Sequence, residues 1–252
     1  MNQQNPGTVL ITGGSRGIGR ATAILAARHG WQVAFTWQTN EAAATKTVGI
    51  IEAAGGVAVG FRGDVTSEAD VQRNFDQTID RFGALHAVVV NAGIVAPSTT
   101  LAEMSVQRLR RVLDTNVFGA LLVAREAARR LSKFVEERDA SIVFVSSAAA
   151  RLGSPFEYVD YAASKGAMDT LTLGLSKELA PESIRVNAVR PGLIETDIHA
   201  SAGQPDRALR LGKGVPMQRP GTAEEVASAI VWLMSAAASY TTGAILDVAG
   251  GR

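Results

Sequence analysis

The chain contains no cysteine, which excludes disulfide bonds and thiolate metal sites. Its three histidines, His29, His86 and His199, are far apart in the sequence and form no H-x-x-x-H pattern, so we expect no metal site. No apolar run reaches membrane-spanning length, and residues 1–7 lack an apolar signal-peptide core. With 25 basic against 24 acidic residues, no global charge favours nucleic acid or an acidic membrane as a partner. We therefore expect a soluble, cytoplasmic protein.

Strand-like and helix-like segments alternate along the chain, with no internal repeat and no low-complexity linker. This alternation is typical of one doubly wound parallel α/β sheet with helices on both faces. We predict a single domain over residues 1–252, with a lid over the poorly periodic segment 197–216. The predicted strands, about seven in number, are Thr8–Thr12, Gln32–Trp37, Val57–Phe61, Leu85–Val90, Ile142–Ser147, Ile184–Val189 and Ala244–Val248. The predicted helices are Arg20–His29, Glu41–Ala54, Ser67–Arg81, Ser105–Glu137, Tyr158–Ala180 and Thr222–Ser235.

A glycine cluster follows the first predicted strand directly and leads into the first helix. Gly13 and Gly17 allow a sharp turn close to a ligand, and Gly19 allows the helix to pack near the strand. The free N–H groups at the start of the helix would then face a pyrophosphate. The spacing is G-x-x-x-G-x-G, which differs both from the G-x-G-x-x-G fingerprint and from a P-loop. Its place between strand and helix favours phosphate binding over a simple tight turn.

The end of the second strand bears on which dinucleotide is bound. NAD-binding proteins usually carry an acidic residue there, which holds the ribose 2′-hydroxyl. Here Thr36–Asn40 contains no carboxylate, and the first acid is Glu41. Arg16 in the glycine loop could meet a 2′-phosphate, although it could also be a solvated loop charge. Both observations favour NADP, with NAD as the alternative.

Tyr161 and Lys165 are four residues apart in a predicted helix, so both can face one cleft. A nearby ammonium should lower the pKa of the phenol from its ordinary value of about 10. A lowered phenol pKa suits a general acid/base acting on an alcohol or a carbonyl. Alone, the Tyr-x-x-x-Lys pattern is common by chance, and the two residues could be a half-buried aromatic and a solvated charge.

Three further positions are candidates for a site at the strand ends. Asp64 could accept a hydrogen bond from an adenine amino group, or cap the helix that begins near Ser67. Small residues in Asn91–Gly93 leave room for a ribose or a nicotinamide over the strand end. Asn116 lies within an otherwise apolar-periodic helical segment, where an inward-facing amide could order a water molecule or kink the helix.

Taken together, these motifs resemble those of the short-chain dehydrogenase/reductase family over nearly the whole chain. The resemblance is greatest to 3-oxoacyl-carrier-protein-reductase-like and glucose-dehydrogenase-like oxidoreductases. The ordered set is far more specific than any one motif. It comprises Thr12–Gly19, Asp64-Val65, Asn91-Ala92-Gly93, Asn116, Ser147, Tyr161-x-x-x-Lys165 and Pro191-Gly192.

The resemblance implies a Rossmann-type fold and a role for each matching residue. Tyr161 would be the general acid/base, Lys165 would hold the nicotinamide ribose, Ser147 would bind the substrate oxygen, and Asn116 would position a relay water. Ser146 remains the alternative to Ser147, since neighbouring strand residues face opposite ways. The implied cofactor contacts are Gly13, Ser15, Arg16, Gly17, Ile18, Gly19, Asp64, Val65, Asn91, Ala92, Gly93, Tyr161, Lys165, Pro191, Gly192, Ile194 and Thr196.

The expected function is therefore an NADP(H)-dependent oxidoreductase that interconverts a ketone or aldehyde and an alcohol. The alternatives are an NAD-preferring sugar or polyol dehydrogenase and a cofactor-binding sensor or scaffold without turnover. The resemblance also implies a homodimer or homotetramer. Residues 94–101, 148–159 and 197–216 should line the substrate pocket, where Glu157, His199 and Arg207 are candidate polar contacts, although surface roles are expected for each.

Overall fold

A computed structural model describes residues 6–131, 140–196, 203–204 and 206–252. Its centre is a seven-stranded sheet in the order β3-β2-β1-β4-β5-β6-β7, with every neighbouring pair parallel. The predicted doubly wound fold is thus confirmed. The strands are β1 (Thr8–Ile11), β2 (Gln32–Trp37), β3 (Val57–Arg62), β4 (Ala87–Val90), β5 (Ala140–Val145), β6 (Ile184–Pro191) and β7 (Ile245–Val248).

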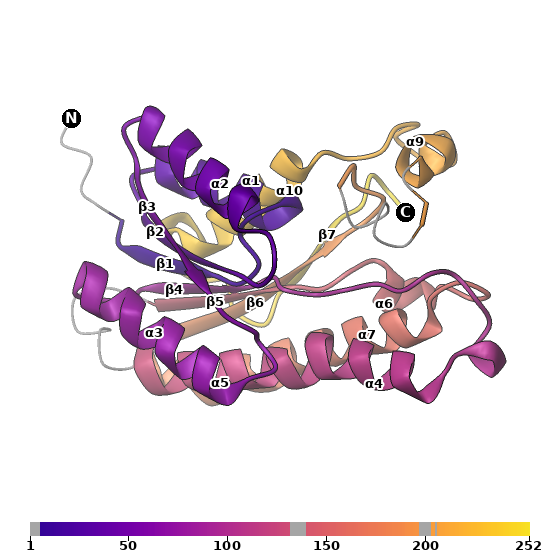
Figure 1. Cartoon of the computed structure of the whole chain (residues 1–252), viewed down its shortest axis with the longest axis horizontal. Helices are drawn as coiled ribbons and strands as arrows, with labels where there is room; N and C mark the ends of the chain where they lie inside the picture. Colours follow the sequence, from indigo (N-terminus) through magenta and orange to yellow (C-terminus); the bar gives the residue numbers. More distant parts are fainter. Residues whose placement is uncertain (1–5, 132–139, 197–202, 205) are drawn as a thin grey trace.

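Helices cover both faces of the sheet (Figure 1). One face carries α1 (Gly17–Arg28), α2 (Glu41–Ala53) and α10 (Ala223–Met234). The other carries α3 (Glu68–Phe82), α4 (Val106–Leu113), α5 (Gly119–Leu131) and α7 (Val159–Leu179). Shorter helices are η1 (Leu101–Glu103), α6 (Ala149–Leu152), η3 (Ala180–Glu182), α9 (Arg207–Gly212) and η4 (Ala236–Ala238).

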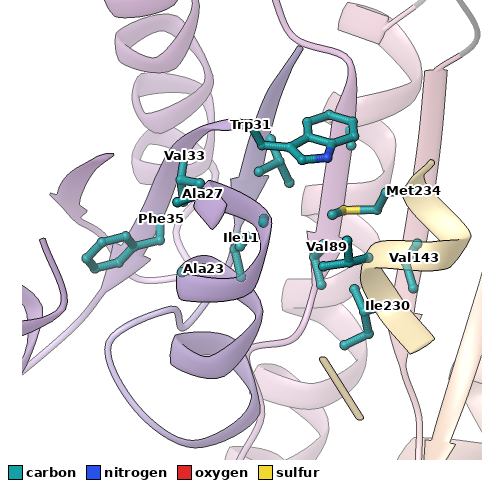
Figure 2. Close-up of a cluster of buried hydrophobic side chains, with 14 of the residues drawn as sticks. Ile11, Ala23, Ala27, Trp31, Val33, Phe35, Val89, Val143, Ile230 and Met234 are labelled. Atoms are coloured by element: carbon teal, nitrogen blue, oxygen red, sulfur yellow. The ribbon is translucent and has the colours of Figure 1, made fainter. Parts of the chain in front are cut away.

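The central strands are buried on both faces, so they are mainly apolar and contribute side chains to two separate cores. Figure 2 shows the core under α1 and α10, where Ile230 and Met234 lie beside Val89 and Val143 of the sheet. The second core lies under α3, α5 and α7 and includes Phe75 and Phe144, both fully buried.

Two segments differ from the prediction. The single helix predicted over Ser105–Glu137 is interrupted by a π-helical turn, η2 (Asp114–Phe118), between α4 and α5, and residues 132–139 lie outside the described part. The irregular segment predicted over 197–216 contains the helix α9, while residues 197–202 and 205 are not described. The capping box predicted at Thr222 and Glu225 is confirmed at the start of α10.

The direction of chain progression reverses at β1 and β4. From β1 the sheet grows outward through β2 and β3, and from β4 it grows the other way. The loops after β1 and β4 therefore diverge to opposite faces and open a crevice at the carboxyl ends of the strands. The glycine loop, Asn91–Gly93 and Ser147 follow strand ends at this edge, while Tyr161 and Lys165 reach it from α7.

Candidate active site

A cleft of about 1430 Å³ occupies this crevice. It is lined by the glycine loop after β1, the ends of β2 and β3, the loop after β4, and the segments after β5 and β6. Nearly all the predicted site residues line the cleft. They are Gly13, Ser15, Arg16, Gly17, Ile18, Asp64, Val65, Asn91, Ala92, Gly93, Ser147, Tyr161, Lys165, Pro191, Gly192, Ile194 and Thr196. Gly19 and Asn116 are buried and do not line it.

The glycine loop has the geometry of an anion-binding turn. Gly13 and Gly17 have positive φ angles of 68° and 52°, which other residues rarely adopt. A Cβ on Gly19 would lie 2.3 Å from the carbonyl oxygen of Gly13, so only glycine fits there. The first turn of α1 contains no acidic residue, and its N-cap, Arg16, makes no side-chain capping bond. The N–H groups at this helix start are therefore available to a phosphate.

Neighbouring strands fix the position of this loop. The Asn91 amide nitrogen donates to the carbonyl oxygens of Thr12 and Gly13 at 2.8 and 3.1 Å. The Thr12 hydroxyl accepts hydrogen bonds from the backbone N–H groups of Asn91 and Ala92, both at 3.0 Å. The Thr36 hydroxyl accepts from the Gly13 N–H at 3.2 Å. Asn91 thus ties the loops after β1 and β4 together, a structural task beyond the open space expected at this strand end.

At the end of β2, a glutamine stands where an acid is common. The Gln38 side chain donates to the Asp64 carboxylate at 2.7 Å, and Asp64 also accepts from the backbone and the hydroxyl of Thr66. Asp64 does not cap α3, because the N-cap is Ser67, whose hydroxyl accepts from the Asp70 N–H. The expected capping role of Asp64 is therefore wrong.

Arg16 points into solvent at the same end of the cleft. Its side chain makes no hydrogen bond or ion pair with any described residue, and Arg16 is exposed. A guanidinium without a partner at the rim of a phosphate-sized turn is available to an anionic ligand.

Tyr161 and Lys165 both reach the cleft from the first turns of α7. The Lys165 amine lies 5.7 Å from the centre of the Tyr161 ring and donates to the Val145 carbonyl oxygen at 2.7 Å. Burial lowers the pKa of Lys165 to about 8, and the charge of Asp169 offsets part of that effect. A Cβ on Gly93 would lie 3.5 Å from this amine, so the glycine leaves the cleft open beside it.

The pKa of Tyr161 moves in the direction opposite to the sequence-based expectation. Burial raises the pKa of the phenol, and a hydrogen bond with the Ser147 hydroxyl offsets this only in part. The expected lowering by Lys165 is therefore wrong: the one group that lowers the pKa of the phenol is Ser147, and desolvation outweighs it. Desolvation depends on the tertiary structure, which the four-residue spacing does not report.

The two adjacent serines have different surroundings. Ser146 is buried, and its hydroxyl donates to the Asp169 carboxylate at 2.7 Å and to the Lys165 carbonyl oxygen at 3.1 Å. The Ser147 hydroxyl bonds to the Tyr161 phenol and accepts from the Ala149 N–H at 3.1 Å. Ser147 is therefore the serine beside the phenol, while Ser146 supports α7 from behind.

Asn116 lies in the π-helical turn and is only 1% exposed. Its amide oxygen accepts from the Ile94 N–H at 2.8 Å, and its amide nitrogen donates to the Ile94 carbonyl at 2.9 Å and to the Ser164 hydroxyl at 3.0 Å. A Cβ on Gly93 would lie 3.3 Å from its oxygen. Asn116 thus connects the loop after β4 to α7, one turn from Tyr161 and Lys165. Such π turns are frequent at functional sites.

At the outer end of the cleft, an ion pair joins the loop before α7 to α9. Arg207 donates two hydrogen bonds of 2.6 Å to the Glu157 carboxylate, and its guanidinium lies 5.2 Å from the centre of the Tyr158 ring. Arg207 is buried, so the expectation of surface roles is wrong for this residue. The third candidate polar contact, His199, lies outside the described residues.

Within the described ranges, no helix is both long and apolar enough to cross a bilayer. The same residues contain no group of three or more histidines and acids placed to hold a metal ion.

The fold and the cleft are those of a large enzyme family. A sequence model for the family described as "Enoyl-(Acyl carrier protein) reductase" matches residues 13–252. The chain belongs to the short-chain dehydrogenase/reductase family, and is thus an oxidoreductase acting on alcohol or carbonyl groups.

Individual relatives agree with this assignment. The chain is 51% identical to "Uncharacterized oxidoreductase YgfF" of Escherichia coli (strain K12) over 96% of this chain and 98% of that protein. It is 34% identical to "Glucose 1-dehydrogenase 2" of Bacillus subtilis (strain 168), over 97% and 93%. The crystal structure of 3-ketoacyl-(acyl-carrier-protein) reductase from Brucella melitensis complexed with NADH superposes with a TM-score of 0.90. It is 30% identical, over 97% of each chain.

Proposed function

We propose that this protein is an NADP(H)-dependent oxidoreductase that interconverts a ketone or aldehyde and an alcohol, with Tyr161 as the general acid/base. The observation that carries the proposal is the meeting of three groups in one cleft: the Tyr161 phenol, the Ser147 hydroxyl bonded to it, and the Lys165 amine. The protein with NADH bound in its crystal structure shares the fold closely, which supports a dinucleotide in this cleft.

The residues present fit a dinucleotide. The tight approach at Gly19 and the positive φ of Gly13 and Gly17 form a cradle that any Cβ would fill or strain. The pyrophosphate would lie against the N-terminus of α1, and Lys165 would hold the ribose next to the nicotinamide. When bound, the cofactor donates or accepts the hydride. The segment from Pro191 to Thr196 would frame the nicotinamide end.

The protein's own groups would manage the proton. Tyr161 would give its phenolic proton to the carbonyl oxygen during reduction and take it back during oxidation. The raised pKa keeps the phenol protonated at neutral pH, the state that a reductase needs. Ser147 would donate to the substrate oxygen and stabilise the developing negative charge. Asn116 would hold the loop after β4 against α7, and would position the water that relays protons from Lys165.

Replacing Tyr161 with phenylalanine tests the acid/base role. We expect Tyr161→Phe to lower kcat by about 10²- to 10⁴-fold, the contribution of a positioned general acid. NADPH binding, followed by its fluorescence, should remain within a few-fold of the wild type. Tyr240→Phe is the matched control, since Tyr240 is fully exposed and far from the cleft lining. A Tyr161→Phe enzyme with near-normal turnover on carbonyl substrates would refute the role.

The NADP preference rests on the free guanidinium of Arg16 and on Gln38 at the end of β2. A charge-assisted hydrogen bond is worth about 1.5–3 kcal/mol, so Arg16→Ala should weaken NADPH binding roughly 10- to 100-fold. NADH binding should hardly change. The control is Arg28→Ala, which removes an exposed arginine from the last turn of the same helix. Equal losses for both cofactors would favour the NAD-preferring sugar or polyol dehydrogenase that the glucose dehydrogenase relative suggests.

The remaining alternative is a cofactor-binding sensor or scaffold. A panel of ketones, aldehydes and sugars, assayed at the nicotinamide absorbance band with each cofactor, separates it from an enzyme. Tight cofactor binding without turnover of any compound would favour the sensor.

Assembly into a homodimer or homotetramer is also part of the proposal. Exposed apolar side chains gather on α5, α7 and the turn before α5, namely Phe118, Leu121 and Leu173. Others lie on or beside the edge strand β7, namely Trp232 and Leu246. Two such surfaces suit two dimer interfaces. Light scattering should give a mass two or four times that of the chain, and a monomer would contradict this.

A further inference from the structure

Asp169 lies one helical turn beyond Lys165 on α7, as Lys165 lies one turn beyond Tyr161. The three side chains therefore share one face of the helix. Asp169 is 9% exposed and does not line the cleft, so it has no direct contact with a ligand there. The family comparison and the cleft leave its role unassigned.

Two groups hold the Asp169 carboxylate in place. One oxygen accepts the Ser146 hydroxyl at 2.7 Å, and the same hydroxyl reaches the Lys165 carbonyl oxygen at 3.1 Å. The other oxygen accepts two hydrogen bonds from Arg190 on β6, from Nε at 3.0 Å and from a terminal nitrogen at 2.8 Å. Such a two-point contact fixes both the position and the charge of the carboxylate.

Few charged groups reach Lys165. On α7 itself they are the Asp169 carboxylate and, as a titratable but protonated group, the Tyr161 phenol. From β5 Lys165 meets the neutral Val145 carbonyl, and from η2 the neutral Asn116 amide. From β6 the nearest charge is Arg190, which contacts Asp169. Asp247 on β7 lies behind Arg190 at 3.8 Å and is 43% exposed in its side chain, so solvent screens it.

We propose that Asp169 and Arg190 are a positioning pair that sets the protonation of Lys165: the carboxylate favours the ammonium, and the arginine limits how strongly it does so. The proposal rests on the proposed function only in that Lys165 is taken as the lysine that serves Tyr161. Neither residue of the pair lines the cleft.

The pair makes two predictions of opposite sign. Asp169→Asn removes the only described anion near the amine and should shift the pKa of Lys165 further down. Arg190→Met removes the cation that offsets Asp169 and should shift it up. For neighbouring charges in a partly buried site, each shift should reach about 0.5 pH unit or more. A purely structural loss would not give shifts in opposite directions.

The experiment measures the lysine directly, without cofactor or substrate. The full chain is labelled with lysine carrying ¹³C at Cε, and the side-chain resonances are followed by NMR as the pH is raised. The chain has only five lysines, and the Lys165 signal is the one missing from Lys165→Met. We expect Lys165 to titrate near pH 8 in the wild type, lower in Asp169→Asn and higher in Arg190→Met.

Two further variants show whether Arg190 acts through Asp169. If Arg190 acts only through Asp169, removing it should have no effect once the carboxylate is gone. In the double variant Asp169→Asn/Arg190→Met, Lys165 should therefore titrate as it does in Asp169→Asn. Arg190→Lys keeps the positive charge and should restore the wild-type titration. If Asp169→Asn does not fold, the comparison of Arg190→Met with Arg190→Lys still decides the proposal.

The matched controls are Glu126→Gln and Arg130→Met, which break a partly buried ion pair of 2.7 Å on α5 with the same changes of charge. They should leave the Lys165 titration unmoved. The proposal is overturned if Lys165 titrates within about 0.2 pH unit of the wild type in both pair variants, or if the controls shift it as much. A wild type without carbonyl–alcohol turnover would instead refute the proposed function, and would leave the NMR result intact.

Discussion

Gly19 makes the tightest contact in the glycine loop, and Gly19→Ala tests whether that contact builds the cofactor cradle. An alanine Cβ there would lie 2.3 Å from the Gly13 carbonyl oxygen and 2.6 Å from the Asn91 amide nitrogen. Real Cβ atoms never come so close to backbone. The first turn of α1 would therefore have to move away from the loop by an ångström or so, which is roughly the shortfall from an ordinary contact of about 3.5 Å.

The energetic effects partly cancel. Replacing glycine by alanine within a helix stabilises the helix by about 0.5–1 kcal/mol. Overpacking costs about 1–3 kcal/mol, and weakening the two Asn91 hydrogen bonds to Thr12 and Gly13 adds about 0.5–1.5 kcal/mol each. The net loss is on the order of 2–4 kcal/mol, which lowers Tm by about 4–16 °C in a chain of this size. NADPH binding should be lost with it, because the same displacement turns the helix N–H groups away from the phosphate.

Gly49→Ala is the control, because the same substitution is made within α2 at an exposed glycine with nothing within 4 Å of the new Cβ. That variant should be more stable than the wild type by about 0.5–1 kcal/mol and should bind NADPH normally. Thermal unfolding followed by circular dichroism, with NADPH titrations at 25 °C, measures both effects. The reasoning is refuted if Gly19→Ala unfolds at the wild-type temperature and binds the cofactor as tightly.

Two further predictions concern pH. Lys165→Met should abolish turnover yet raise stability at pH 7, because a buried ammonium whose pKa falls to about 8 costs on the order of 3 kcal/mol, partly offset by its bond to Val145. The unfolded wild type binds more protons than the folded one between pH 8 and the ordinary lysine value. Its stability therefore rises over that window, and urea unfolding should show the advantage of the variant shrinking there. At Glu225, Arg219 and the Thr222 N–H lower the pKa of the carboxyl to about 2. That stabilisation is present above the unfolded pKa and is lost as the pH falls towards 2. Glu225→Gln should thus flatten the dependence of Tm on pH between about 5 and 2, and an unchanged slope would contradict this.

The sequence alone sufficed for the architecture, because all seven strands and the long helices have local sequence patterns, whereas the short helices α6 and α9 were not predicted. The strand Gln32–Trp37 was predicted to the residue, since Trp31 and Gln38 bound a run with strong β-propensity. The prediction of one long helix over 105–137 was wrong at η2, because a π turn adds only one residue to a helical turn and so leaves little trace in the sequence. The isolated Asn116 was the one local sign of it.

The sequence predicted which residues lie in the cleft, but it did not predict the pKa shift of Tyr161 or the ion pairs. Motif order placed Ser147, Tyr161 and Lys165 together, yet the direction of the Tyr161 pKa depended on burial, which spacing does not report. The ion pairs were beyond reach for a related reason. Glu157 and Arg207 lie 50 positions apart, so only the folded chain shows that each is the other's partner.

The pairing of β1 with β4 has a consequence for the order in which the chain folds during its synthesis. Thr12 and Asn91 are 79 positions apart, and their hydrogen bonds connect the loops after β1 and β4 at the base of the crevice. Well over a third of the polypeptide must therefore leave the ribosome before the loops after β1 and β4 can form these hydrogen bonds. Until then, the sheet formed by the first three strands has an unpaired edge. It cannot bind a nucleotide, and it is exposed to pairing with other chains. A dinucleotide bound across both loops would stabilise them in the closed arrangement once they have formed.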